Sequence, residues 1–294
     1  QTRVPRFGIL TAEAFDAHTS QPAGAAPLAA ARANGFPDEA ARTALGAAMV
    51  RAVLRNALPV SVRIGLSELL ASFAEEDVLA VRASVVGEPL EAAVVSGALD
   101  SSLAVKGKDA LEEAVLRMMA LAFHPRTLGL REGAGLPALG LRLAIVVQRM
   151  VSSEASGVCV SLETHAHASS SSIAKRPMAL VRGCYGLAGG IGGKQGSPRI
   201  PSDLVRVERP SVAADNVDDD ARVEMEIALK GEQLKLDDAS GKTVTRMVPV
   251  PEHMKRECGV STVQARMIAK EALRLEAAFG KPQVVSWAFA GRLL

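Results

Sequence analysis

The sequence predicts a fold of mixed helices and strands, α+β or α/β, whose C-terminal half is rich in strands. Composition is the first observation: 48% of the 294 residues are hydrophobic and 22% are charged, as in a globular chain with a sizeable core. Runs with the period of a helix and short β-branched runs also occur along the same chain. Short alternating runs at Val223–Leu229, Gln233–Leu236 and Thr243–Val248 are typical of antiparallel strands. The length suits one large domain of two lobes, or two modest domains.

The first half is expected to begin with a strand at Val4–Leu10. Residues 22–35 are rich in Ala, Pro and Gly, which indicates a loop with weak helix. Pro37 then opens a helix whose apolar positions recur every three or four residues. Leu79–Val85 is expected to be a buried strand, and Val94–Val105 a hairpin. The next helix has its apolar face at Leu111, Val115, Met118 and Ala122.

The second half is expected to open with buried strands at Leu143–Val151 and Gly157–Leu162. Its last helix has the clearest boundaries. Ser261 and Gln264 form a capping box at the start, and Gly280 follows the end. A final strand is expected at Val284–Trp287. The predicted apolar stripe of this helix is Ile268, Ala272, Leu275 and Phe279.

Several classes of partner are disfavoured by composition. A formal charge of +2 provides no strong field for nucleic acid. The cysteines Cys159, Cys184 and Cys258 are far apart, odd in number and without a CxxC pair, which indicates reduced thiols and no zinc site. We therefore expect an intracellular location, in the cytoplasm or an organelle matrix. No apolar run approaches the roughly 18 residues of a membrane span, so none is expected.

Four stretches carry a resemblance that covers nearly the whole chain. They are VPRFGILTAEAFDAH, LAVRASVVGEPLEAAVVSGALDSSLAV, LAIVVQRMVSSEASGVCVSLET and AKEALRLEAAFGKPQVVSWAF, with the weaker CYGLAGGIGGKQGSPRIPSDLVRV before the last. In this order they resemble the N-terminal nucleotide-binding domain of phosphoenolpyruvate synthase and pyruvate phosphate dikinase. The resemblance implies an α+β fold of the ATP-grasp type. It implies a single domain over residues 1–294, with approximate lobes 1–145 and 146–294 and a nucleotide cleft between them.

Phosphoryl transfer from ATP needs positive charge at the phosphates. Arg82 lies in an apolar strand, so its guanidinium should pair with a phosphate or with a structural carboxylate. The resemblance implies the phosphate. It also implies a flexible loop at Gly97 over the triphosphate, with Ser101 in place of the family's Thr and Ala98 in place of its Gln. An ordinary hairpin turn would explain Gly97 equally well.

Arg126 stands where the resemblance implies a further contact to the phosphates. The family's preceding Asp is Pro125 here, and Arg131 could repeat the role. A solvated arginine at a helix end is the alternative.

Gln148, Arg149 and Met150 end a predicted strand where the resemblance implies the hinge beside adenine. Backbone groups would read the edge of the base, and the Met side chain would pack on its face. A plain core position is the alternative for Met150.

Three positions depart from the family. Its acidic residues fall at Gly189, Val284 and Ser286, none of which is a carboxylate. Magnesium needs oxygen ligands, usually one or two carboxylates, so no bound Mg²⁺ is expected. The resemblance still implies ATP as a ligand. We assign no catalytic residue and no metal ligand. The family's Gly-Gly-Lys turn would lie before Gln1, and its final Gln-x-Arg after Leu294.

Two further motifs do not support other activities. GGIGGKQGS lacks the first glycine of a phosphate-binding P-loop, and Gln195 replaces the required Ser or Thr. THAHAS places His165 and His167 in a serine-rich loop without acidic partners, which favours a surface turn.

Two functions remain. In the first, which the resemblance implies, the chain binds ATP with Arg82, Gly97, Ser101, Arg126 and residues 148–150. Phosphoryl transfer would go to a histidine on a separate domain or partner chain, and would be impaired here. In the second, it is a catalytically inactive structural or regulatory subunit of a larger assembly.

Overall fold

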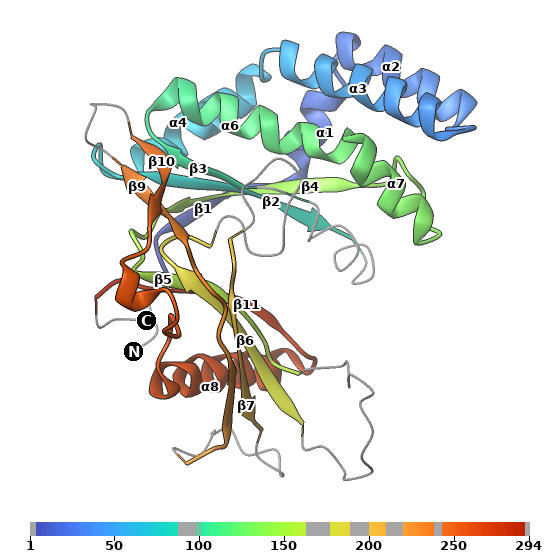
Figure 1. Cartoon of the computed structure of the whole chain (residues 1–294). Helices are drawn as coiled ribbons and strands as arrows, with labels where there is room; N and C mark the ends of the chain where they lie inside the picture. The colour runs from blue at the N-terminus through green and yellow to red at the C-terminus, as the bar shows by residue number, and fades with distance from the viewer. Residues whose placement is uncertain are drawn as a thin grey trace. The chain divides into compact units, whose positions relative to one another are not determined.

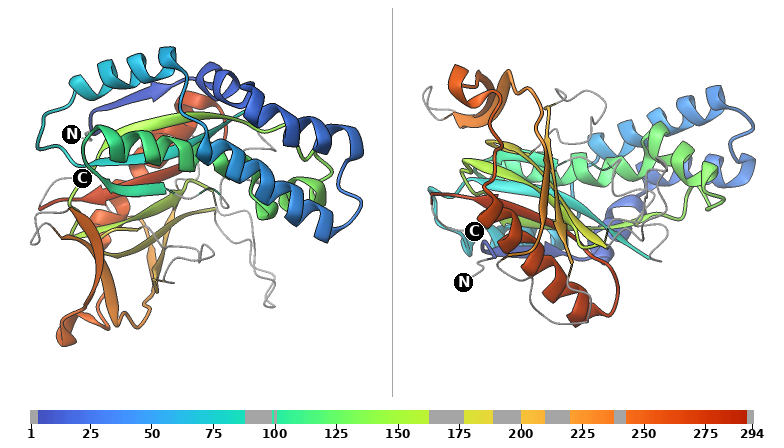
Figure 2. Two further views of the ribbon diagram at one scale, coloured as in Figure 1. Left: turned by 90° about the horizontal axis from the view of Figure 1, so that it is seen from above. Right: turned by 60° about the horizontal axis from the view of Figure 1, so that its bottom comes forward.

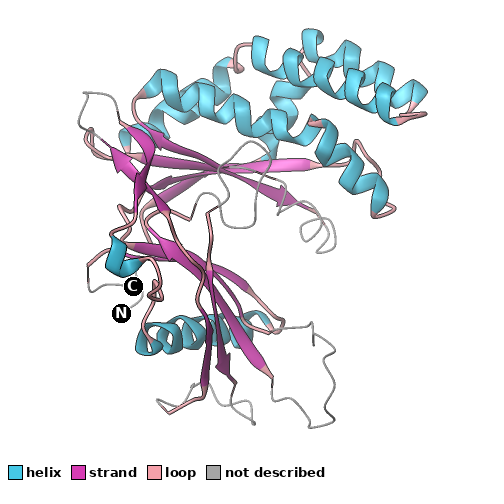
Figure 3. Ribbon diagram, in the orientation of Figure 1, coloured by secondary structure: helices cyan, strands magenta, loops and turns pink. Residues whose placement is uncertain are grey.

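The computed structural model describes residues 4–87, 99, 101–162, 177–188, 200–209, 220–237 and 243–291. These residues form two compact units, one built mainly on Pro5–Met150 and the other mainly on Val151–Asp237 and Thr245–Leu294. We refer to them as the N-terminal and C-terminal units. Helices dominate the first and strands the second, so the expected mixture of helices and strands is confirmed (Figures 1 and 3).

The N-terminal unit is a four-stranded sheet covered by helices on one face (Figure 1). The strand order is β1-β4-β2-β3, and all neighbours are antiparallel. The strands are β1 (Phe7–Leu10), β2 (Leu79–Val86), β3 (Ser101–Val105) and β4 (Arg142–Arg149). The helices are α1 (Ala12–Thr19), α2 (Pro22–Asn34), α3 (Glu39–Arg55), α4 (Val60–Ala71), α6 (Lys108–Ala120), η1 (Leu121–Phe123) and α7 (Pro125–Gly133).

Alternation along the strands decides which face of this sheet the helices cover. Val81 and Val147 are opposite one another and fully buried beneath the helices. Helices α1, α4 and α6 lie on this face, while α3 packs on α6 and α7, and α2 packs on α3. Gly8 permits the close approach of α4, because an added Cβ would lie 2.0 Å from Leu69 Cδ1. No helix among the described residues of this unit lies on the other face, and we call it the open face of the four-stranded sheet.

The C-terminal unit contains a five-stranded antiparallel sheet with the order β11-β5-β6-β7-β8. Helix α8 crosses one face of it, as the views in Figure 2 also show. Strands β9 and β10 form a separate two-stranded sheet. The elements are β5 (Ala155–Val160), β6 (Met178–Tyr185), β7 (Asp203–Glu208), β8 (Val223–Glu226), β9 (Glu232–Asp237), β10 (Val244–Pro249), η2 (Glu252–Met254), α8 (Thr262–Phe279) and β11 (Val284–Phe289).

The start of α8 is confirmed and its buried face is corrected. The Ser261 hydroxyl accepts from the Gln264 amide, the Gln264 side chain accepts from the Ser261 amide, and Gly280 ends the helix in the left-handed region. However, Leu275 is 36% exposed and Phe279 is 66% exposed, so the stripe does not continue to the end of the helix. The buried positions are Ala265, Ile268, Ala269, Ala272 and Leu273.

Two other expectations differ from the structure. Residues 22–34 form the complete helix α2. The run expected as a strand from Val223 to Leu229 stops at Glu226. Among the described residues no single helix is long and apolar enough to cross a membrane, although α3 and α4, bent by 67° relative to each other, pass that test together by length and composition.

Candidate functional site

The open face of the four-stranded sheet brings together three of the residues that the sequence analysis selected. Arg82 is directly opposite Val146 on one side and Ser101 on the other, so Arg82 and Ser101 share a face. Gln148 is opposite Ala80, two residues along β2 from Arg82, and lies on the same face. Diagonal neighbours of this kind are about 7–8 Å apart. An anion over Arg82 would therefore have polar side chains from both flanking strands within reach.

Arg82 has no ion-pair partner among the described residues, whereas Arg142 on the same face pairs with Asp16. Desolvation by the surrounding protein lowers the pKa of the Arg82 guanidinium from its ordinary value. The residue is nevertheless exposed, so a ligand could reach it from solution. Since arginine remains charged at any ordinary pH, Arg82 presents an uncompensated cation. The structural alternative considered above, a salt bridge to a carboxylate, is not found in the described part of the chain.

The strand end at Gln148–Met150 is held by backbone hydrogen bonds. The Arg149 amide donates to Arg6 O at 2.8 Å, and the Met150 amide donates to Val78 O at 2.7 Å. These two amides are therefore not available to the edge of a base. The side chain of Arg149 belongs to the opposite face from Gln148, because successive residues of a strand alternate.

Met150 is positioned by an irregularity in β3. The pairing of β2 with β3 shifts between Leu79 and Val81, and Ala104 adopts a φ of 58°, which is uncommon for a residue other than glycine. The Ala104 amide lies 3.4 Å from Met150 Sδ and donates to it. This contact fixes the thioether at the end of β4, beside the open face.

Arg126 lies apart from these residues in the fold. It is an exposed residue in the first turn of α7, a helix that packs chiefly on α3 and η1, and its amide donates to His124 Nδ1 at 3.3 Å. Arg131, the other candidate at this point, is fully buried and donates from Nε to Pro137 O at 2.8 Å. Arg131 is therefore a structural residue. Gly97, Gly189 and the histidines of THAHAS lie outside the described residues.

The five-stranded sheet also has a face on which none of the described helices lies. Alternation puts Val284 and Ser286 of β11 on this face, opposite Val160 and Val158 of β5. Val284 is 71% exposed. Neither residue can supply a carboxylate, so the positions where the resemblance implied metal ligands do not fit a magnesium ion.

The same face carries Arg182, which the sequence analysis missed. Arg182 is opposite Val158 and therefore lies in the same cross-strand row as Ser286. It is exposed and has no ion-pair or hydrogen-bond partner among the described residues, while Arg206 on the next strand pairs with Glu226. The signal was present in the sequence, because MALVRGCY is an apolar strand interrupted by one arginine, as is the strand of Arg82.

A groove of about 570 Å³ opens beside Arg182. We call it the β6–β8 groove. Arg182, Leu204 and Glu226 are consecutive in one cross-strand row and form its floor. Its walls are formed by residues of two connecting segments, Ile200, Pro201, Ser202, Ile227 and Ala228.

A buried ion pair holds the walls of this groove. Asp203 and Lys230 have side chains only 1% exposed, and Lys230 Nζ donates to Asp203 Oδ1. The Asp203 carboxylate also accepts the amides of Ala228 at 2.9 Å and Gly259 at 2.8 Å. Lys230 Nζ lies 5.5 Å from the ring centroid of Tyr185 and donates to Ala228 O at 3.0 Å. Every charge in this group is compensated, which indicates a structural role.

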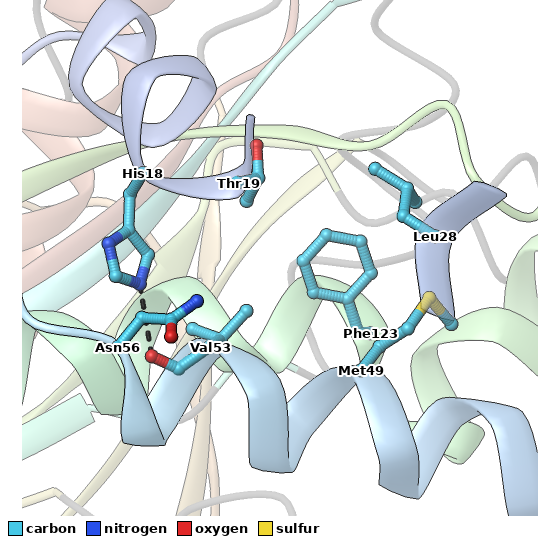
Figure 4. Close-up of a pocket in the computed structure, with 7 residues that line it drawn as sticks. All are labelled: His18, Thr19, Leu28, Met49, Val53, Asn56 and Phe123. Carbon is cyan, nitrogen blue, oxygen red and sulfur yellow. Dashed lines mark hydrogen bonds between the residues drawn. The ribbon is translucent and has the colours of Figure 1, made fainter. Parts of the chain in front are cut away.

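An enclosed pocket in the N-terminal unit is too small for a nucleotide (Figure 4). Its volume is about 10 Å³, roughly the room for one water molecule. His18 is 1% exposed, its Nε2 lies 3.0 Å from Val53 O, and Gln21 Nε2 donates to its Nδ1. Desolvation lowers the pKa of His18. The lining residues are His18, Thr19, Leu28, Met49, Val53, Asn56 and Phe123.

The described residues contain no group of three or more His, Cys, Asp or Glu side chains that could hold a metal ion. A magnesium ion bound to a nucleotide needs only one or two protein carboxylates. On the helix-free face of the five-stranded sheet, the Glu226 carboxylate is already paired with Arg206. The residues therefore fit a polyphosphate better than they fit a metal.

Each of the two sheets has helical cover on one face and, on the other, an arginine without an ion-pair partner among the described residues, an arrangement suited to an anionic ligand. A family model for the pyruvate phosphate dikinase AMP/ATP-binding domain matches residues 1–293. The chain belongs to this family, which confirms the resemblance inferred from its motifs.

The similar proteins are large enzymes. The chain is 27% identical over 246 residues to a probable phosphoenolpyruvate synthase of Methanocaldococcus jannaschii, covering 82% of the chain and 19% of that protein. It is 28% identical over 249 residues to a rifampicin phosphotransferase of Streptomyces sviceus, covering 85% and 26%. It is 26% identical over 295 residues to a phosphoenolpyruvate synthase of Neisseria meningitidis, covering 97% and 35%. The chain thus spans about a fifth to a third of the length of these relatives.

Proposed function

We propose that the chain is a nucleotide-binding domain of the ATP-grasp type, with ATP as its ligand. In this proposal the two compact units are the two lobes, and the nucleotide lies in a cleft between them. Membership of an AMP/ATP-binding family supports the ligand. The phosphates are assigned to Arg82, Ser101 and the loop at Gly97, with Arg126 as a further contact, and adenine to Gln148, Arg149 and Met150.

The observation that carries the proposal is the unpaired guanidinium of Arg82. An arginine within an apolar strand is expected to have a partner, because an isolated charge near the interior is unfavourable. Here none of the described carboxylates provides it, and the group stays exposed on the open face. A phosphate would supply the missing charge and accept two parallel hydrogen bonds from the guanidinium.

The assignment of adenine is narrowed by the hydrogen bonds at the end of β4. Since the amides of Arg149 and Met150 are engaged, the base edge would have to be read by carbonyl groups or by the next free amide, that of Val151. The Met150 thioether, held by the Ala104 amide, would pack against the flat face of the ring.

Catalysis would need a second domain. The chain covers only part of each enzyme to which it is similar, and we propose that any phosphoryl transfer goes to a histidine on a separate domain or partner chain. In such a transfer, this chain would bind the phosphates and orient them through Arg82.

The second candidate is a catalytically inactive structural or regulatory subunit. The specific observation in its favour is that Val284 and Ser286 share the helix-free face of the five-stranded sheet without providing a carboxylate. A domain that has lost its magnesium ligands would keep the scaffold and the arginines while losing turnover.

The test is titration of the purified chain with ATP by calorimetry, once with magnesium and once with EDTA. Arg82→Ala should weaken binding by about 2–3 kcal/mol, or about 30- to 150-fold in Kd, because a charge-assisted contact is lost. Arg117→Ala is the matched control, since Arg117 is an exposed arginine that pairs with Glu113 on the helix side. No ATP binding by the wild-type chain, or equal affinity in both variants, would refute the proposal.

Turnover separates the two candidates. The inactive-subunit proposal expects ATP binding without AMP release, both for the chain alone and with a histidine-bearing partner added. Magnesium-dependent AMP release at ordinary rates would refute that second candidate.

A further inference from the structure

The β6–β8 groove, and the strand β11 that β5 separates from it, have a charge pattern that the family resemblance does not explain. Arg206 and Glu226 neutralise each other at the edge of the groove. Asp203 and Lys230 do the same beneath it. This leaves the guanidinium of Arg182 as the uncompensated charge on this face among the described residues. The groove is therefore cationic at one defined point.

The geometry gives this cation polar neighbours. Arg182 and Ser286 are separated by the single strand β5, which places their backbones about 9–10 Å apart at the usual strand spacing. Val158 lies between them and offers no competing polar group. Ser202 lines the groove next to Leu204, on the other side of Arg182. An extended polyphosphate could contact the guanidinium and one of these hydroxyl groups at the same time.

Val284 and Ser286 place no negative charge on this face. Carboxylates there would repel a phosphate unless a divalent cation lay between them. With a methyl-bearing side chain and a hydroxyl in their place, an arginine two strands away can contact the phosphate directly. The uncharged side chains at positions 284 and 286 and the presence of Arg182 thus act in the same direction.

We propose that Arg182 is a polyphosphate-binding residue and that this chain binds the phosphates of its ligand without a divalent metal ion. The inference rests on the proposed nucleotide-binding function and extends it by naming the ligand chemistry and the residue. The phosphate chain could belong to a nucleotide or to inorganic polyphosphate, because Arg182 recognises only the charge and the oxygen atoms.

In the experiment, the whole chain is titrated in the presence of EDTA with inorganic tripolyphosphate, ATP and adenosine, each in a separate titration. The heat of binding is measured by calorimetry. Tripolyphosphate should bind the wild-type chain under these conditions, and added magnesium should not strengthen binding. Arg182→Ala should weaken tripolyphosphate binding at least about 10-fold, because a charge-assisted pair is lost. Arg222→Ala is the control, since it removes an arginine that pairs with Glu224 at the start of β8. It should change affinity less than about 2-fold, as expected for an exposed pair.

Folding of the variants can be followed separately. Trp287 is the only tryptophan of the chain and lies on β11, so its fluorescence reports the integrity of this sheet. If Arg182→Ala disturbs that signal, Arg182→Lys serves instead. It keeps the charge but not the planar fork, and should show intermediate affinity.

The outcomes distinguish this inference from the proposed function. Loss of ATP binding in Arg82→Ala, with unchanged binding of both ligands in Arg182→Ala, would overturn the role of Arg182 and leave the proposed function intact. Binding of tripolyphosphate only with magnesium would overturn metal independence. A third outcome is that tripolyphosphate binding depends on Arg182 but ATP binds no more tightly than tripolyphosphate. That outcome would support the inference and refute a nucleotide as the ligand. Absence of all binding would refute both.

Discussion

Removal of the Asp203 carboxylate should be among the most destabilising single changes in the C-terminal unit. The Asp203 carboxylate accepts hydrogen bonds from the Lys230 ammonium group and from the backbone amides of Ala228 and Gly259, the latter two at 2.9 and 2.8 Å. These donors lie in segments distant in sequence from Asp203. Asp203→Asn keeps the size of the side chain and removes its charge. The Lys230 ammonium group, 1% exposed, then remains buried without a counter-ion.

The magnitude follows from the burial of both partners. Loss of one partner of a buried ion pair costs about 3–5 kcal/mol, because the other charge is left without compensation. An amide at position 203 also directs its NH₂ group towards a backbone donor. Lys230→Met should cost less, about 1–3 kcal/mol, because the two amides still satisfy the carboxylate. The double variant should be more stable than the sum of the two effects predicts.

Urea unfolding followed by Trp287 fluorescence measures these differences, because this tryptophan is 7% exposed and belongs to the same unit. Arg222→Ala breaks an exposed pair and should cost no more than about 1 kcal/mol. If Asp203→Asn were no more destabilising than Arg222→Ala, the pair would not hold the walls of the groove.

Two further predictions concern packing and pH. Gly157→Ala should destabilise the C-terminal unit by about 1–3 kcal/mol in the same unfolding assay, because the new Cβ would lie 1.9 Å from Arg182 O and 2.8 Å from Trp287 Cζ2. Gly231→Ala, with open space around its Cβ, is the control, and equal stability of the two variants would contradict the packing. The lowered pKa of buried His18 means that the folded state resists protonation, so its stabilising effect is fully present above the unfolded pKa of about 6.5 and is lost as the pH falls through the lower folded pKa. Thermal unfolding between about pH 5 and pH 8 should show this slope in the wild type and a reduced slope in His18→Gln; equal slopes would exclude His18 as its source.

Much of the fold could be predicted from local pattern. The apolar alternation of β2 and β4 and the capping box of α8 are encoded by residues close together in the chain. The buried face of α8 was harder to predict, because the residues after Leu273 are not buried. Phe279 continues the spacing of the stripe but has no partner to cover it. Periodicity indicates which residues could be buried, and the neighbouring element decides which ones are.

The candidate site shows the same division. Arg82 was found because a guanidinium is unexpected in an apolar strand, and Arg182 satisfies the same criterion in MALVRGCY but was overlooked. The resemblance pointed to Arg126 and its alternative Arg131, yet only the structure shows that Arg131 is buried against Pro137.

The sequence by itself determined the family, the mixture of helices and strands, and the identity of the arginines that could bind phosphate. The tertiary structure alone decided which of those charges are compensated. Arg142 meets Asp16 across 126 residues of chain, and Lys230 meets Asp203 across 27, while Arg82 and Arg182 meet no described carboxylate. The physical reason is that propensity and periodicity are local, whereas the partner of a charge is set by strand register and packing between distant segments.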